Sequence, residues 1–178
     1  LNVDLSLQPD NTGKVRMPTP GGDTLLSALQ LNVDYDAQRQ GGWTASLTAN
    51  DMEQAETKID AAKLVASGVV ANVGDPENRQ LTFTAKGGLE GMQFADAALT
   101  QAMGDSIAFQ GDGSWKTGNP VDLRGLQLVA QAFGLQTSGR LSGATYDGAT
   151  HISISNLAAF SVLADRKLAG KLQCSFFV

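Results

Sequence analysis

Between residues 120 and 155 the chain alternates apolar and polar side chains, and this alternation restricts the folds open to it. The apolar positions are Leu126, Leu128, Ala130, Phe133, Leu135, Ile152 and Ile154. The residues between them are mostly Gln, Ser, Thr or Gly. A period of two is typical of a β-strand with one dry face and one wet face. The stretch therefore predicts strands, and Asp147-Gly148 predicts a turn, as Asp112-Gly113 does earlier in the chain.

The same alternation recurs along the rest of the chain and predicts about a dozen short strands in all. They are expected at residues 1–7, 15–17, 29–35, 43–49, 59–73, 81–85, 107–115 and 168–176, besides the stretch above. The turn residues of segment 38–42 predict a hairpin. We interpret residues 50–56 as a loop, with a helix over residues 51–66 as the alternative.

Two short helices are expected to interrupt the strands. Segment 94–103 is rich in alanine and is followed by Gly104, which suits a helix C-terminus. Asn156 predicts the N-cap of a second helix over residues 157–164. Because no Gly/Ser-rich or Pro-rich linker divides the chain, residues 1–178 are expected to form one all-β domain with these two helices.

Composition narrows the class of partner. The net charge is -5 at pH 7 and no stripe of Lys and Arg is present, so the sequence predicts no nucleic-acid partner. The 20 glycines suit turns, bulges and sharp bends of a sheet.

The chain begins at Leu1 within a strand pattern and ends with Phe176 and Phe177 within another strand pattern. We therefore expect the chain to be an internal piece of a longer protein.

The sequence contains no constellation typical of catalysis or metal binding. His151 is the only histidine and is interpreted as an ordinary strand residue rather than a ligand or a base. Cys174, the only cysteine, alternates with apolar residues and is expected in the core. Asp34 and Asp36 are expected on a solvated strand face. The sequence thus predicts a protein that is not an enzyme, with no catalytic residue, metal site or cofactor.

The alternation leaves two architectures open. One is a closed β-sandwich, in which the dry faces of two sheets pack together. The other is a long, strongly curved sheet whose dry face serves as a binding groove, and glycine helps this geometry by easing tight curvature. The residues expected to face such a groove are Leu31, Val33, Tyr35, Leu47, Leu81, Phe83, Ile107, Phe109, Leu126, Leu128, Leu135, Ile152, Ile154 and Leu172.

Three segments of the second half resemble alphaproteobacterial members of the TamB family, which belongs to the wider AsmA-like group. They are ADAALTQAMGDSIAFQGDGSW (residues 95–115), FGLQTSGRLSGATYDG (residues 133–148) and HISISNLAAFSVLADRKLAGKL (residues 151–172). They are similar to the family's short Ala/Leu helix ending in glycine, its alternating strand ending in Trp, and its closing helical turn and strand. Asp165 stands where the family has glycine, and Lys167 where it has proline.

The resemblance implies a "β-taco", which is a long U-shaped sheet with an apolar interior and a polar exterior. It also implies a periplasmic segment of a protein anchored in the inner membrane, with a TamA-like partner in the outer membrane. Two roles follow from it. One is the transport of phospholipid, or another amphiphile, between the two membranes along the apolar groove. The other is assistance in the assembly or secretion of outer-membrane proteins by strand pairing.

The broad aliphatic dry face favours the first role, since apolar side chains shield acyl chains without specific contacts. The strand-pairing scaffold is the alternative, because an unpaired sheet edge offers main-chain donors and acceptors to an incoming strand. End-to-end self-association of such segments is left open.

Overall fold

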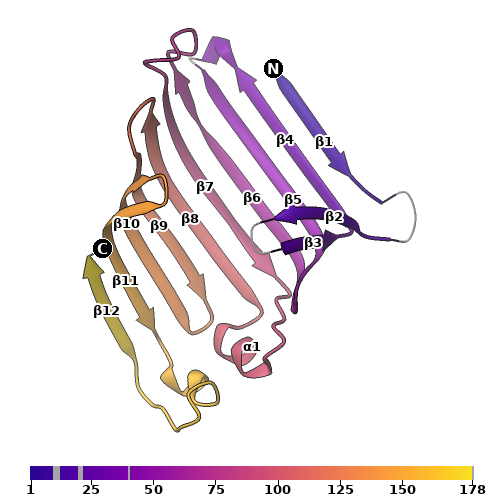
Figure 1. Ribbon diagram of the computed structural model, residues 1–178, viewed down its shortest axis with the longest axis vertical. Helices are drawn as coiled ribbons and strands as arrows, with labels where there is room; N and C mark the ends of the chain where they lie inside the picture. Colours follow the sequence, from indigo (N-terminus) through magenta and orange to yellow (C-terminus); the bar gives the residue numbers. More distant parts are fainter. Residues whose placement is uncertain (10–12, 20–21, 40, 178) are drawn as a thin grey trace.

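The strands of the protein form one antiparallel sheet that is not closed (Figure 1). The computed structural model describes residues 1–178 except residues 10–12, 20–21, 40 and 178. Within the described residues the sheet has 12 strands, and its two edge strands, β1 and β12, are not neighbours. The all-β class is therefore confirmed. The closed sandwich is wrong, because a sandwich needs two sheets packed face to face.

The strands and helices follow one another in a simple order. The strands are β1 (Asn2–Leu7), β2 (Val15–Thr19), β3 (Gly22–Leu26), β4 (Ala28–Asp36), β5 (Gly42–Gln54), β6 (Thr57–Ala71), β7 (Gln80–Glu90), β8 (Ser106–Lys116), β9 (Val121–Ala130), β10 (Phe133–Ser142), β11 (Thr145–Ile154) and β12 (Leu172–Phe177). The helical segments are η1 (Ala37–Arg39), α1 (Ala97–Met103) and η2 (Leu157–Phe160). Along the sheet the order is β1-β4-β5-β6-β7-β8-β9-β10-β11-β12. The β2–β3 hairpin joins the sheet only through β3 and β5 and lies in front of it in Figure 1.

The register of the strands puts the alternating apolar residues on one side of the sheet. Residues that pair across antiparallel strands point to the same face. One row of such partners runs from β1 to β12 through Leu5, Leu31, Leu47, Leu64, Gly87, Phe109, Leu128, Leu135, Ile152 and Cys174. We call this side of the sheet the apolar face.

The adjacent row of partners points to the opposite side. It runs through Asp4, Asn32, Ser46, Val65, Lys86, Gln110, Gln127, Gln136, His151 and Ser175. We call this side the polar face. The sheet therefore separates two kinds of surface across the thickness of a single backbone layer.

Among the described residues, the fully buried hydrophobic side chains lie in two places. Under the β2–β3 hairpin, Leu26, Leu29 and Ala49 form a small cluster against which Leu7, Val15, Met17, Leu47, Met52 and Ala62 pack. At the end of the sheet that carries α1, the buried residues are Met92, Ala102, Ala130 and Ala132. Between these two places the apolar side chains that β4–β11 turn to the apolar face are half-buried, except for the exposed Leu141 of β10.

The accessible surface supports the same conclusion. The chain exposes 11304 Å². A compact monomer of 18.6 kDa would expose roughly 8,200 Å² by the usual scaling of surface with mass. The excess is what a single-layer sheet produces when no second layer covers the middle of its apolar face.

Glycines allow aromatic rings to lie flat across neighbouring strands of this face. A Cβ atom placed on Gly87 would lie 2.6 Å from Cζ of Phe109, its partner on β8, and would also meet the Lys63 carbonyl oxygen. A Cβ on Gly113 would lie 2.8 Å from Cζ of Phe83, its partner on β7. Each ring thus occupies the space that the glycine leaves empty, which is a known way to stabilise glycine within a sheet.

Several sequence-based predictions of local structure are wrong. Residues 50–56 are not a loop, and residues 51–66 are not a helix, since β5 and β6 continue through them to a tight turn at Ala55, where φ is 50°. The β5–β6 pairing along this whole length outweighs the weak local preference of the segment. The β3 strand was not predicted. Pro18 and Gly22, residue types that usually interrupt strands, both lie within the β2–β3 ladder.

The two Asp-Gly pairs are not turns either. Asp147 and Gly148 lie within β11 and pair with Arg140 and Gly139 of β10. Asp112 and Gly113 lie within β8, at the point where its register with β9 shifts. In both places the glycine sits where the sheet is crowded rather than where the chain reverses. The hairpin expected at residues 38–42 falls partly outside the described residues.

The first helix prediction is confirmed by α1, which is shorter than expected, whereas the second segment forms only a 3-10 helix of 4 residues, η2. Asp96 caps α1 by accepting a hydrogen bond from the Ala98 N–H (2.8 Å), and Gly104 ends it with φ of 80°. Asn156 caps η2 in the same way through Ala158 (3.1 Å).

The contact between Gly87 and Phe109 leads to a testable expectation. Gly87→Ala should lower the free energy of unfolding by about 1–3 kcal/mol, because the added methyl must displace the ring or the β6 backbone. Gly74→Ala is the matched control, since a Cβ there meets nothing within 4 Å, and it should change stability by less than about 0.5 kcal/mol. Urea denaturation of the three proteins measures both effects. Equal stability of the two variants would contradict the packing described here.

Candidate functional site

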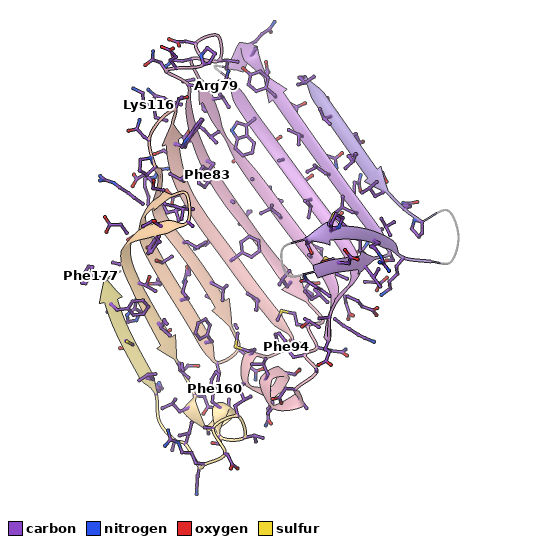
Figure 2. All side chains as sticks on the ribbon, in the orientation of Figure 1. Arg79, Phe83, Phe94, Lys116, Phe160 and Phe177 are labelled. Atoms are coloured by element: carbon purple, nitrogen blue, oxygen red, sulfur yellow. The ribbon has the colours of Figure 1, made fainter. Side chains whose placement is uncertain are left out.

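The structure brings the apolar residues singled out in the sequence to one side of the sheet. Register places all of them on the apolar face, in rows that cross from strand to strand (Figure 2). They are Leu31, Val33, Tyr35, Leu47, Leu81, Phe83, Ile107, Phe109, Leu126, Leu128, Leu135, Ile152, Ile154 and Leu172. Their contact with a lipid stays a prediction.

Other residues of the same face were not singled out. Leu64 pairs with Leu47 and completes the central row, and Trp43 pairs with Tyr35 near the start of β5. The signal was present in the sequence, because Trp43 lies an even number of residues before Leu47 and must share its face. Leu64 was missed because the alternation around it is weak, since valine and alanine occur at both the odd and the even positions of this segment.

The aromatic rings of this face lie close to the sheet, over glycines of the neighbouring strands. Phe83 and Phe109 lie over the space left by Gly113 and Gly87 on the neighbouring strands. The Trp43 indole lies over Gly68 of β6 in the same way, with its Nε1 atom buried and without a hydrogen-bond partner among the described residues. The rings therefore spread along the sheet, so the apolar surface is broad and continuous rather than divided into deep pockets.

The β2–β3 hairpin covers one end of the apolar face and is held there by charge as well as by packing. Lys14 Nζ lies 3.0 Å from Glu53 Oε1 of β5, and Lys58 Nζ of β6 lies 3.7 Å from the same atom. The hydrogen bond from Lys14 lowers the pKa of Glu53 below its usual value, and Lys58 adds to this effect. The carboxylate therefore links the start of the hairpin to the sheet beneath it.

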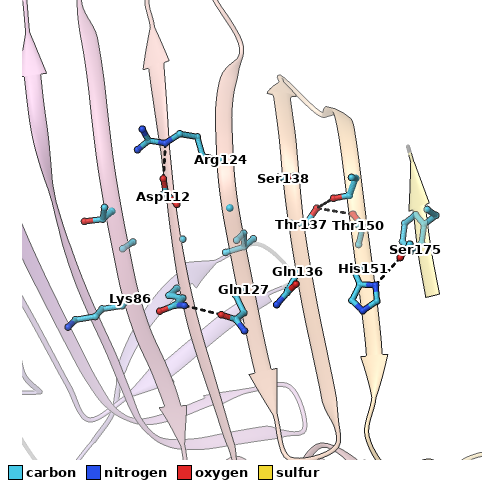
Figure 3. A pocket seen from close by; sticks show the side chains of 18 of the residues that line it. Lys86, Asp112, Arg124, Gln127, Gln136, Thr137, Ser138, Thr150, His151 and Ser175 are labelled. Carbon is cyan, nitrogen blue, oxygen red and sulfur yellow. Dashed lines mark hydrogen bonds and ion pairs between the residues drawn. The ribbon is translucent and has the colours of Figure 1, made fainter. Parts of the chain in front are cut away.

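The polar face carries a shallow hollow of about 980 Å³, shown in Figure 3. Several pairs of polar side chains that line it interact with each other, and three of them include charged, amide or imidazole groups. Arg124 Nε lies 2.7 Å from Asp112 Oδ2, Gln110 Nε2 donates to Gln127 Oε1 at 2.9 Å, and His151 Nδ1 lies 2.8 Å from Ser175 Oγ. His151 and Ser175 lie at the distance of a base and a hydroxyl nucleophile, but among the described residues no hydrogen bond to a third group orients the imidazole. No cluster of potential metal ligands occurs among the described residues either.

The titratable candidates from the sequence are not brought together. His151 is a strand residue, as expected, and its partner is a serine on the edge strand. Asp34 is exposed on the polar face and accepts a long hydrogen bond from Asn2 Nδ2 (3.4 Å). Asp36 accepts a hydrogen bond from the Gln38 backbone N–H (2.8 Å) at the end of β4.

Cys174 is not in the core, contrary to the prediction. It pairs with Ile152 and so points to the apolar face, but it is exposed. The reason is its place on β12, which is an edge strand with a neighbour on one side only. Alternation within a strand shows which face a residue occupies, whereas its burial depends on what lies beside and above that strand.

Both edges of the sheet end in exposed strands. The residues of β12 are all exposed, and those of β1 are exposed except for Leu7. Each strand pairs on one side only within the part of the chain that the structure describes. Such edges offer unpaired N–H and C=O groups to another strand.

Comparison with protein-family models, with curated proteins and with solved structures gives no significant match. In the described residues no helix combines the length and hydrophobicity that a membrane crossing requires. The candidate site is therefore defined by the geometry of the sheet alone.

The exposure of Cys174 can be tested by chemical labelling. The folded protein should take up one equivalent of a water-soluble maleimide without denaturant, since reactivity of a thiol follows its exposure. Ala49→Cys in a Cys174→Ser background is the control, because Ala49 is buried under the hairpin and its thiol should react only after unfolding. Protection of Cys174 in the folded protein would contradict an open edge at β12.

The depressed pKa of Glu53 predicts a pH dependence for the hairpin. Because the folded pKa lies below the usual value of 4.5, the stabilisation by Lys14 is present above that pH and is lost as pH falls through the folded pKa. Amide-exchange protection of the β2–β3 hairpin, relative to that of β7, should therefore decrease at acid pH. In Glu53→Gln this relative protection should be lower at neutral pH and should change less with acidification. A variant that behaves like the parent protein would show that packing alone holds the hairpin.

Proposed function

We propose that this chain is a non-enzymatic segment that shields the acyl chains of phospholipid, or of another amphiphile, on its apolar face. The observation that supports this most strongly is the uncovered central part of that face, between the β2–β3 hairpin and α1. Soluble monomers rarely leave a continuous apolar surface of this kind without a partner. Leu64, Phe109 and Leu128 lie in its central row and are only half-buried.

The energetics of transfer suit such a surface. Each methylene of an acyl chain that leaves water gains about 0.8 kcal/mol. The gain depends on area rather than on directional contacts, so a broad and flat apolar face can hold chains of different length and position. The central rows of the face carry no charged side chain among their partners from β4 to β11. A lipid tail therefore meets no charged group along these rows, and the polar groups on this face include the hydroxyls of Thr137 and Thr150, which are hydrogen-bonded to each other.

The proposal includes a larger geometry in which the sheet curves into a U with the apolar face inside. The single open sheet is compatible with that shape. The resemblance of residues 95–115, 133–148 and 151–172 to the TamB family supports a place in the periplasm, in a protein anchored in the inner membrane, with a TamA-like partner at the outer membrane. In that setting the apolar face would form part of a path for lipid between the two membranes.

The alternative function is a scaffold that pairs with strands of outer-membrane proteins during their assembly. The exposed edge strands β1 and β12 favour it, since each is paired on one side only among the described residues. This function depends on the backbone at the edges, whereas lipid shielding depends on side chains in the middle of the sheet. The two proposals therefore respond differently to substitutions.

Leu128→Glu separates them. A carboxylate in the central row must be desolvated when a tail covers it, so extraction of phospholipid from vesicles should fall at least about tenfold. Val129→Glu is the matched control, because Val129 is the next residue of β9, points to the polar face and is 47% exposed. It should extract lipid as the parent protein does. Strand pairing at the edges should survive both substitutions.

A photo-crosslinking residue gives an independent measurement. Placed at Phe109 it should capture phospholipid, and placed at Gln110 on the opposite face it should not. Equal capture at both positions, or no capture at Phe109, would count against the apolar face as the lipid surface.

A further inference from the structure

The hollow on the polar face is a second candidate site, and the lipid hypothesis does not use it. Its lining extends from Val65 and Ser67 on β6 to Ser175 and Phe177 on β12. Six spacings between neighbouring strands correspond to roughly 28 Å along the sheet. A second hollow of about 770 Å³ shares Val65, Lys86 and Gln110 with it, so the depression continues along these strands. The site is therefore long, shallow and open rather than a closed pocket for a small molecule.

The floor of the hollow is a row of neutral hydrogen-bonding side chains. Gln110, Gln127 and Gln136 stand at paired positions on β8, β9 and β10, and His151 and Ser175 continue the row on β11 and β12 (Figure 3). A glutamine amide has two donor hydrogens and an acceptor oxygen with two lone pairs. The single bond from Gln110 to Gln127 leaves donors and acceptors of both amides facing the hollow. Register fixes their spacing, because each residue is held by its own strand.

The charges in the hollow nearly cancel. Its charged lining residues are Lys86, Asp112 and Arg124, and Arg124 is paired with Asp112 at 2.7 Å. One net positive charge is too little for a polyphosphate chain, which needs a series of cations. An extended peptide is also disfavoured, because peptides bind sheets by adding a strand to an edge, whereas four of the five strands of this row, β8 to β11, lie inside the sheet. An apolar ligand would leave the amides without partners.

We propose that the polar face binds a neutral, extended oligosaccharide in this hollow. Sugar hydroxyls both donate and accept hydrogen bonds, which matches the amide, imidazole and hydroxyl groups of the row. Phe177 lines the hollow at its β12 end and is 88% exposed, so its ring is free to stack against the apolar face of a sugar. The chain would lie across the strands, with several sugar rings each contacting a different strand. This site is independent of the lipid surface, because the two occupy opposite faces.

The proposal can be tested by following backbone amide resonances of the intact chain during titration with defined probes. The probes are cellohexaose, maltohexaose and hexa-N-acetylchitohexaose, with glucose as the monosaccharide control. At least one hexasaccharide should shift resonances of β8–β12 around Gln110, Gln127 and His151, with weaker binding by its disaccharide. Gln127→Ala should weaken that binding about fivefold, as expected for loss of one neutral hydrogen bond.

Gln30→Ala is the matched control, because Gln30 is an exposed residue of β4 on the polar face outside the hollow. It should leave the affinity unchanged. If Gln127→Ala does not fold, the map of shifted resonances in the parent protein still decides the question. Absence of shifts with all three hexasaccharides, or shifts confined to the edge strands, would overturn the proposal. Stronger shifts of β8–β12 with a heptapeptide of alternating Ser and Val would also overturn it, in favour of a peptide site.

Discussion

The structure depends on a register that keeps the alternation of every strand in phase with its neighbours. A slip of one residue between two strands would turn all apolar side chains of one strand to the opposite face. In β9 the alternation of apolar residues is interrupted, because Leu123 and Leu126 are three residues apart rather than two or four. A bulge absorbs the extra residue, so that Gly113 faces Leu123 and Gly111 faces Leu126. The extra residue, Arg124, forms an ion pair with Asp112. Both leucines therefore remain on the apolar face.

Once the register is set, the sheet has little else to stabilise it. The buried residues form two small groups, one under the β2–β3 hairpin and one at the α1 end. Most of the remaining stability must come from the backbone ladder and from cross-strand contacts on the apolar face. The packing of Phe109 over Gly87 and the packing of Phe83 over Gly113 are two such contacts. The same rings keep the face smooth, so one packing device serves both the stability of the sheet and the proposed binding of acyl chains.

The two faces of the sheet offer different chemistry at a separation of one backbone layer. The apolar face offers a hydrophobic surface without directional contacts, which suits flexible hydrocarbon chains. The polar face offers donors and acceptors at fixed spacing, which suits a hydroxyl-rich chain. Because Leu128 and Val129, or Phe109 and Gln110, are adjacent in sequence and opposite in space, each face can be altered without the other. The edges are a third kind of surface, and their role depends on the backbone rather than on side chains.

The sequence by itself determined the class of fold and the assignment of side chains to faces, because a period of two is a local property of each strand. Leu31, Phe109, Leu128 and Ile152 share a face as the pattern predicted. The sequence could not determine which strands are neighbours, whether the sheet closes, or what covers each face. Those depend on pairing between residues far apart in the chain. For that reason Cys174 is exposed although its pattern resembles that of a core residue, and Asp112-Gly113 lies within β8, opposite the bulge of β9, rather than in a turn. The hollow on the polar face was also decided only by tertiary structure, since its row of amide, imidazole and hydroxyl groups exists only when five separate strands stand in register.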